Sequence, residues 1–304
     1  MSAQPSTATR RQNTTRRAVE AAVHVARSHG IRVDEPIVLN DLFSVVVHLA
    51  PAPVVACVPT WISRLRDNVE DAMRREIAVT EFLHAQGAPV VAPSTDLPPG
   101  PHRHDGFAVS FWPYVEADPD RTVTAADCAV MLPDLHRALA AYPGDLPTLE
   151  AAAVDVTRWL ESAETATGSG SASSWLDVLR TAASRLRPLL KATAGTVVVH
   201  GDAHPGNMIA SRPGLLWIDF EEVSRGPAEW DYATIGDDGA LEVLDALDSA
   251  SAVDPRRLAD CRRLRSLQIA LCLLALREDF ADVDGWDQGI EGFVVSLAEP
   301  GRGD

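Results

Sequence analysis

The chain has 304 residues, of which 46% are hydrophobic, and its formal net charge at pH 7 is −16. This length supports one large domain or two lobes with separate hydrophobic cores. The negative charge argues against a general nucleic-acid-binding protein, because such proteins neutralise phosphates with lysine and arginine. No apolar run approaches the roughly 20 residues that cross a bilayer, so we expect no membrane span.

The termini and cysteines give further expectations about location. The arginines near the N-terminus are not followed by an apolar stretch, so we expect no secretory signal. The four cysteines, at positions 57, 128, 261 and 272, are widely scattered and form no C-x-x-C pair. This spacing favours reduced thiols and a cytoplasmic location over a disulfide framework or a structural zinc site.

The N-terminal third reads as a tail followed by helix, hairpin, helix and strand. The polar residues 1–18 predict a flexible tail, and TTRRAVEAAVHVARSHG predicts a helix capped by Thr14 or Thr15 that stops at Gly30. Two β-branched runs, Ser44–Leu49 and Val54–Val58, predict a hairpin. DNVEDAMRREIAVTEFLHAQG then has helical spacing, and FAVSFWPYV reads as a strand.

From about Thr122 the pattern becomes mostly helical. Three helical segments precede a β-rich stretch, and the low-complexity TGSGSASS between two of them predicts a surface loop. More helix follows the β-rich stretch, notably RRLADCRRLRSLQIALCLLALRED. The fold class is therefore α+β, with a small β-rich lobe at 19–112 and a larger, mostly helical lobe at 113–304.

The β-rich stretch VVVHGDAHPGNMIASRPGLLWIDFEEV, Val197–Val223, gathers acids and imidazoles between apolar strands. Buried charges are costly unless they are paired or bound to a metal, so this stretch is the candidate site. In a hairpin centred near Pro213, Asn207 and Asp219 are equidistant from the turn and face each other. Oxygen ligands from few protein groups suit Mg²⁺, and Asp202 a few residues earlier can accept a proton from an attacking hydroxyl.

These residues also carry a resemblance. HGDAHPGN followed by WIDFEEVSRGPAEWDYA resembles the aminoglycoside phosphotransferase family, which has a bilobal protein-kinase-like fold. The resemblance implies that Asp202 is the catalytic base and that Asn207 and Asp219 hold Mg²⁺. It also implies that Asp231 supports the catalytic loop, and we expect His200 to be a buried imidazole that bonds the same loop.

The resemblance extends more weakly to the small lobe. FWPYV matches the hinge where adenine binds, which makes Trp112 and Tyr114 candidate nucleotide contacts, and Glu76 resembles the glutamate of the small-lobe helix. The expected activity is transfer of the γ-phosphate of ATP or GTP to a hydroxyl of a small molecule, an antibiotic or another metabolite. The expected partners are therefore a nucleotide and a small acceptor, with no nucleic acid and no membrane.

One departure from the family pattern is prominent. The position of the family's phosphate-binding lysine aligns with Cys57, the only lysine of the chain is Lys191, and VLNDLFSVVV lacks the glycines of a phosphate-covering loop. Either Arg64 or Arg66 substitutes for the lysine, or the nucleotide binds weakly or in another pose. The alternative is a catalytically weak or silent nucleotide-binding member of the same fold.

Two further hypotheses concern metal and acceptor. His200, Asp202 and His204 alternate, which is also typical of a transition-metal site in a metal-dependent hydrolase. In the family, acids of the helical lobe bind cationic acceptors, so a cationic, aminoglycoside-type acceptor is expected. Its candidate contacts are the acids Glu229, Glu278, Asp279 and Asp282.

Overall fold

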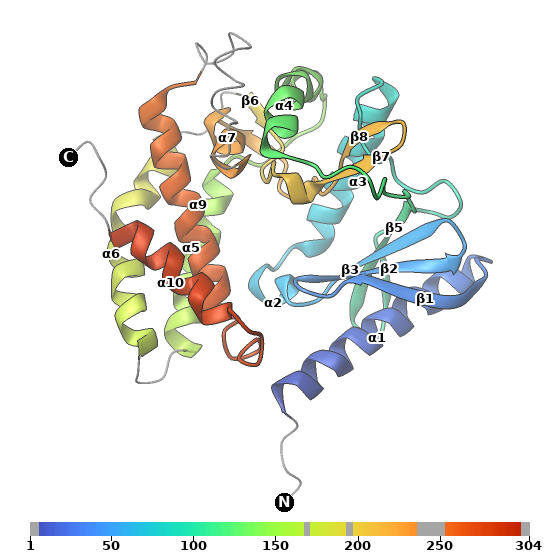
Figure 1. The fold of residues 1–304 in the computed structure, drawn as a ribbon, viewed down its shortest axis with the longest axis horizontal. Helices are drawn as coiled ribbons and strands as arrows, with labels where there is room; N and C mark the ends of the chain where they lie inside the picture. The colour runs from blue at the N-terminus through green and yellow to red at the C-terminus, as the bar shows by residue number, and fades with distance from the viewer. Residues whose placement is uncertain (1–5, 167–170, 193–196, 236–252, 299–304) are drawn as a thin grey trace, which may run out of the picture.

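The computed structural model describes residues 6–166, 171–192, 197–235 and 253–298. Its N-terminal part is built on a five-stranded antiparallel sheet and its C-terminal part mainly on helices (Figure 1). This arrangement confirms the predicted α+β class. The strand order is β1-β2-β3-β5-β4. The strands are β1 (Val33–Asn40), β2 (Ser44–Pro51), β3 (Val54–Pro59), β4 (His102–His104) and β5 (Phe107–Pro113).

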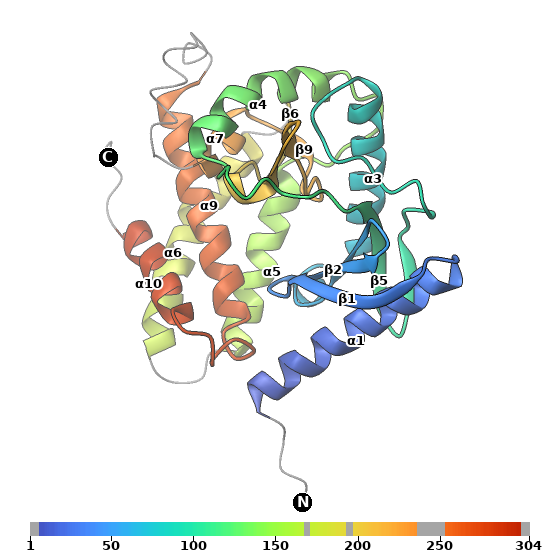
Figure 2. The ribbon, with the colours of Figure 1, turned by 45° about the vertical axis from the view of Figure 1, so that its right-hand side comes forward.

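The sheet presents two different faces because side chains alternate along each strand. On one face, Val45, Val47 and Leu49 are fully buried in a core shared with helix α1 (Thr7–Ser28). Helix α1 lies along this face of the sheet (Figure 2). Val46, which lies between two of them, points to the other face. Cys57 on the neighbouring strand does the same, and both residues line a cavity there.

Helix α1 begins at Thr7, so the prediction of a flexible tail over residues 1–18 is wrong from that residue onward. The Ser6 hydroxyl caps the helix by accepting a backbone N–H of the first turn at 3.2 Å. The predicted caps, Thr14 and Thr15, lie inside the helix, where their hydroxyls donate to carbonyls four residues earlier. Residues 1–5 lie outside the described part of the chain.

The predicted hairpin is confirmed as β2 and β3, but β1 was missed. Only Val33 of its eight residues is buried, and Pro36 interrupts the run, so the sequence has no alternation to detect. A proline is tolerated here because β1 is an edge strand, where one side of the backbone needs no partner. The predicted helix before Gly87 is α3 (Val69–Ala85), which follows the short α2 (Ile62–Leu65).

The helical part is organised around α9, which packs against α5, α6, α7 and α10 (Figure 1). Because it is surrounded, α9 is buried on most sides, and its buried positions include the polar residues Arg265 and Gln268. Among the described residues, no helix is long and apolar enough to span a membrane. The helices are α4 (Ala125–Ala140), α5 (Glu150–Ala166), α6 (Ser171–Ala192), α7 (Glu229–Ile235), α9 (Pro255–Ala275) and α10 (Trp286–Ala298).

Two small sheets sit between the lobes. β6 pairs with β9, and β7 pairs with β8 as a hairpin. The predicted loop TGSGSASS falls at the start of α6, which begins at Ser171; residues 167–170 lie outside the described part. The predicted boundary between residues 112 and 113 falls at the end of β5 and stays a prediction. The elements are β6 (Val197–Val199), 3₁₀ helix η1 (Pro205–Asn207), β7 (Met208–Ser211), β8 (Gly214–Trp217) and β9 (Ser224–Gly226).

Candidate active site

The β7–β8 hairpin brings Asn207 and Asp219 to one cavity, with a register that differs from the prediction by one residue. Its strand pairs centre the turn between Arg212 and Pro213. The backbone N–H of Ile218 therefore donates to the Asn207 carbonyl at 3.0 Å, and Asp219 lies one position beyond. The expected facing pair is wrong because the turn contains two residues rather than being centred on one.

Asp219 reaches the cavity through its backbone conformation instead. Its φ of 65° lies in the left-handed region, which aspartate tolerates better than most residues. The side chain is exposed, and the surface to which it is exposed is that of the cavity that Asn207 also lines. Hairpin pairing thus places the segment, and a strained residue at its end aims the carboxylate.

Asp231, from α7, anchors the loop between β6 and η1. Its carboxylate is fully buried and accepts the backbone N–H groups of His200 and Gly201, each at 2.8 Å. His136 Nε2 lies 2.8 Å from the same carboxylate. Burial by itself would raise the pKa of Asp231, but the His136 bond, the nearby imidazoles and the backbone donors hold that pKa below its usual value. The loop is therefore tied to a buried anion.

Gly201 is required where the loop turns. Its φ is +94°, and a Cβ there would lie 2.2 Å from the carbonyl oxygen of Glu222. The carbonyl of Gly201 accepts the indole N–H of Trp230 at 3.0 Å. These contacts fix the residue that immediately precedes Asp202.

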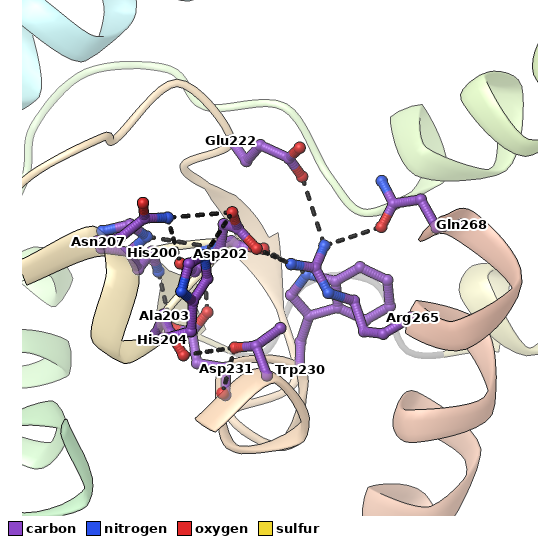
Figure 3. A network of polar contacts seen from close by, with 12 residues as sticks. His200, Asp202, Ala203, His204, Asn207, Glu222, Trp230, Asp231, Arg265 and Gln268 are labelled. Carbon is purple, nitrogen blue, oxygen red and sulfur yellow. Dashed lines mark hydrogen bonds and ion pairs between the residues drawn. The ribbon is translucent and has the colours of Figure 1, made fainter. Parts of the chain in front are cut away.

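The Asp202 carboxylate is held from both sides (Figure 3). On one side, Asn207 Nδ2 donates to Asp202 Oδ2 at 3.0 Å, and His204 Nε2 lies 3.4 Å from the same oxygen. On the other side, the guanidinium of Arg265 pairs with Oδ1. Burial raises the pKa of Asp202, yet Arg265 and the imidazoles of His204 and His200 bring it below the usual range, so the group is ionised at neutral pH.

Arg265 is the site residue that sequence reasoning missed. It comes from α9, 63 positions after Asp202, and only 6% of its surface is exposed. Its guanidinium lies 5.0 Å from the ring centroid of Trp230 and 3.6 Å from Glu222, and it donates to Gln268 Oε1 at 2.8 Å. Because α9 contains several arginines, the local sequence does not indicate which of them lies in the site. Arg265 differs from ordinary surface arginines in being buried among the helices, which only the tertiary structure shows.

The residues present fit a hard divalent cation. The Asn207 amide gives its hydrogens to the carbonyl and the carboxylate of Asp202, which turns its own oxygen away from them (Figure 3). The surrounding protein partly removes Asp219 from water, and this desolvation raises its pKa well above the usual value. The negative charges of the nearby Glu221 and Glu76 raise the pKa further. A carboxylate in such a surplus of negative charge, beside an amide oxygen, is the donor set that Mg²⁺ favours.

The alternative transition-metal site loses one of its ligands. Both ring nitrogens of His200 are engaged in the loop: Nε2 contacts the Ile218 carbonyl at 3.0 Å, and Nδ1 accepts the Asp202 N–H at 3.3 Å. Burial lowers the pKa of His200, in keeping with a neutral imidazole that bonds the backbone. Within the described ranges, no group of three or more His, Cys, Asp or Glu side chains has the arrangement of a metal site. The hydrolase hypothesis is therefore not supported.

A cavity of about 660 Å³ extends from the sheet to α9, with Asp202 and Asp219 on its wall. Its sheet-side end is an apolar slot lined by Val46 and Val55 of the sheet and by Ile209 and Ile218 of the β7–β8 segment. The predicted nucleotide contacts Trp112 and Tyr114 line this end. The Tyr114 ring stacks on His48, with 3.8 Å between ring centroids, and the Trp112 indole donates to Ser110 Oγ at 3.1 Å.

The departure at Cys57 has an electrostatic counterpart at Glu76. Burial raises the pKa of Glu76 to about 8, with Glu221 adding to the shift, so Glu76 is mostly protonated at pH 7. Burial likewise raises the pKa of the Cys57 thiol, and Glu76 and Asp219 raise it further. Glu76 Oε1 accepts the Phe220 N–H at 3.2 Å. A neutral thiol and a neutral acid thus replace the usual ion pair of lysine and glutamate.

Of the two arginines considered as substitutes, Arg66 lines the cavity and Arg64 does not. Arg64 pairs with Asp279 at 2.5 Å and is half-exposed. Arg66 is mostly buried and pairs with Glu221 at 3.1 Å and with Glu222 at 2.5 Å. The candidate arginine that lines the cavity is therefore already paired with carboxylates.

None of the four acids predicted to bind a cationic acceptor lines the cavity. Glu229 is buried and accepts the backbone N–H of Asp254 at 2.9 Å. Asp279 pairs with Arg64, Asp282 pairs with Arg11 of α1, and Glu278 is on the surface. Glu229 lies on α7, and the turns after α9 direct Asp279 and Asp282 toward arginines of the N-terminal part and Glu278 toward solvent.

Comparisons with known proteins agree with this geometry. No curated protein matches the sequence. The structure is similar to that of the choline kinase LicA from Streptococcus pneumoniae, with 16% identity, a TM-score of 0.62, and coverage of 91% of this chain and 98% of that chain. It is also similar to the amicoumacin kinase hAmiN in complex with AMP-PNP and Ca²⁺, with 14% identity, a TM-score of 0.61, and coverage of 90% and 92%.

A third similar structure is a spectinomycin phosphotransferase in complex with ADP and spectinomycin, with 11% identity, a TM-score of 0.57, and coverage of 91% of this chain and 94% of that chain. At these identities the likeness establishes the protein-kinase-like fold. The model of the phosphotransferase enzyme family matches residues 54–265, well over half of the chain. The match begins at β3, includes the loop between β6 and η1 and ends inside α9, and the protein therefore belongs to the phosphotransferase enzyme family.

Proposed function

We propose that this protein transfers the γ-phosphate of ATP or GTP to a hydroxyl group of a small molecule, with Mg²⁺ as the metal. The observation that supports this most directly is the joint position of Asp202, Asn207 and Asp219 on one cavity wall, with Asp202 ionised and fixed from both sides. This is the division of roles in kinases, where one carboxylate accepts a proton and an Asn/Asp pair holds the metal.

In the proposed reaction, the acceptor hydroxyl attacks the γ-phosphorus. A bond forms between the acceptor oxygen and phosphorus, the bond to the bridging oxygen breaks, and the nucleoside diphosphate leaves. The hydroxyl proton passes to Asp202. Asn207 and Asp219 would hold Mg²⁺, which when bound neutralises charge on the phosphates.

The nucleotide base would occupy the apolar slot on the sheet side. Its walls, Val46 and Val55 against Ile209 and Ile218, match the two faces of a flat ring, and Trp112 and Tyr114 lie along its edge. Binding there places the phosphates beside Asp219, so the acceptor would enter from the α9 end. We further propose that the protein works in the cytoplasm on these two small molecules, without nucleic acid or membrane.

The test is a mass-spectrometric screen of alcohol libraries with Mg·ATP and Mg·GTP. We expect a mass gain of one phosphate on at least one acceptor, and loss of that product when EDTA removes the metal. Calorimetry with the same nucleotides identifies the silent alternative: nucleotide binding without phosphate transfer or hydrolysis would contradict the proposed reaction.

Replacing Cys57 with lysine is expected to tighten nucleotide binding. A lysine on β3 would face Glu76, and the ion pair would favour the charged form of that acid and supply a phosphate contact. We expect the Kd for Mg·ATP to fall by roughly tenfold, the size of a charge-assisted contact worth about 1.5 kcal/mol. Calorimetry of Cys57→Lys and Cys57→Met separates charge from bulk; equal effects of the two would contradict the alignment of Cys57 with the lysine.

A further inference from the structure

Beside its charged groups, the end of the cavity next to α9 has a wall of apolar side chains. Ile62 of α2 and Ile269, Cys272 and Leu273 of α9 contribute to this wall. Gln268 adds one polar group; its oxygen accepts a bond from Arg265, so its amide nitrogen points away from the arginine (Figure 3). This end offers apolar surface and a hydrogen-bond donor to whatever binds beside Asp202.

Each carboxylate that lines this end of the cavity already has an arginine partner within the described structure. Glu221 pairs with Arg66, and Glu222 pairs with both Arg66 and Arg265. Asp202 pairs with Arg265. Both arginines are mostly buried, with 15% and 7% of their side chains exposed, so solvent screens these pairs weakly. A ligand ammonium group would have to compete with each pair.

The aromatic ring at this end, that of Trp159, is already covered by Arg66. The guanidinium carbon of Arg66 lies 5.6 Å from the ring centroid of Trp159, which is within the range of a cation–π contact. Trp159 is only 2% exposed, and its indole N–H donates to the Leu65 carbonyl at 3.0 Å. The ring therefore has almost no free face on which a quaternary ammonium group could stack.

We propose that the acceptor is an uncharged alcohol with an apolar body, and that Arg66 sets this preference by pairing with Glu221 and Glu222 and covering Trp159. A cationic acceptor would lose its hydration without finding a free carboxylate or ring face, and it would lie close to Arg66. An uncharged acceptor packs on the wall of α9 and accepts a hydrogen bond from Gln268. This inference rests on the proposed phosphotransferase function and differs from the expectation of a cationic acceptor.

The test compares matched alcohols that differ in one substituent, a hydroxyl in one and a protonated amine in the other. For the wild-type protein with Mg·ATP, we expect kcat/KM for the uncharged member to exceed that for the amine by about tenfold or more, since the protonated amine would lie close to the like charge of Arg66. In Arg66→Met, Glu221 loses its arginine partner, Glu222 keeps only Arg265, and the cation over Trp159 is gone, so this ratio should fall by at least about tenfold.

Two variants serve as controls. Arg66→Lys keeps a cation near Glu221 and Glu222 and should retain most of the preference. Arg64→Met removes the neighbouring arginine, which is half-exposed and pairs outside the cavity with Asp279, and should leave the ratio within twofold of wild type. Calorimetry with Mg·ATP checks that each variant is folded.

Two results would overturn the inference. The first is a wild-type kcat/KM that is higher for the amine than for the uncharged alcohol, and this result does not depend on whether Arg66→Met folds. The second is a folded Arg66→Met with the same kcat/KM ratio as wild type. A wild-type protein that binds Mg·ATP but transfers phosphate to neither member of any pair would instead contradict the proposed function, and this inference with it.

Discussion

Replacing Asp202 with alanine is expected to lower kcat for phosphate transfer by about 10²–10⁴-fold, the usual contribution of a positioned general base. Asp202 is the ionised carboxylate on the cavity wall, and its two oxygens are held by Asn207 and Arg265. Without it, the acceptor hydroxyl has no carboxylate placed to receive its proton. Nucleotide binding should change little, because the slot that would receive the base lies at the other end of the cavity.

Single-turnover kinetics and calorimetry with Mg·ATP measure the two effects separately. Asp134→Ala, which removes an exposed carboxylate of α4, is the matched control and should behave as wild type. Turnover in Asp202→Ala within threefold of wild type would exclude Asp202 as the base. A loss of nucleotide binding as large as the loss of turnover would assign Asp202 to the metal site instead.

Replacing Asp231 with asparagine is expected to lower the free energy of unfolding by roughly 3–5 kcal/mol, as for other broken buried pairs. Asp231 is fully buried and satisfies two backbone N–H groups and His136. Asparagine retains one acceptor oxygen but carries no charge, and its amide hydrogens face donors. The loop that carries Asp202 should loosen, so kcat should fall as well.

The same residue predicts how stability depends on pH. Because the folded chain holds the pKa of Asp231 below its usual value, the unfolded chain takes up the proton first as pH falls. The contribution of Asp231 is therefore complete above the ordinary carboxyl pKa of about 4 and is lost as pH falls through the lower, folded value. Urea unfolding from pH 7 to pH 3 should show the gap between wild type and Asp231→Asn closing toward acid.

The exposed Asp134→Asn serves as the control for this series, since its removal should cost little at any pH. A gap that stays constant over the whole range would show that the Asp231 charge does not stabilise the fold. A gap that widens toward acid would contradict the sign of the pKa shift.

Local pattern predicted the elements that carry their own signal. The valine runs gave β2 and β3, the helical spacing before Gly87 gave α3, and the motif from His200 onward gave the fold class and family. Strand β1 was missed because an edge strand buries one residue of eight and so leaves no alternation. The start of α1 was missed because polar residues in a helix look like those of a tail.

The candidate site shows the same difference between features of one local segment and contacts between distant segments. The order of Asp202, Asn207 and Asp219 is a property of one short segment, so the sequence by itself determined which residues are proposed as the catalytic set, and it showed that Cys57 stands where the family pattern has a lysine. The partners of that set come from distant segments: Arg66 follows β3, and Arg265 lies on α9. Whether a carboxylate is free or paired depends on which charges packing brings within a few ångströms of it. The tertiary structure alone therefore decided that the acids expected to bind the acceptor do not line the cavity and that those beside Asp202 are already paired with arginines.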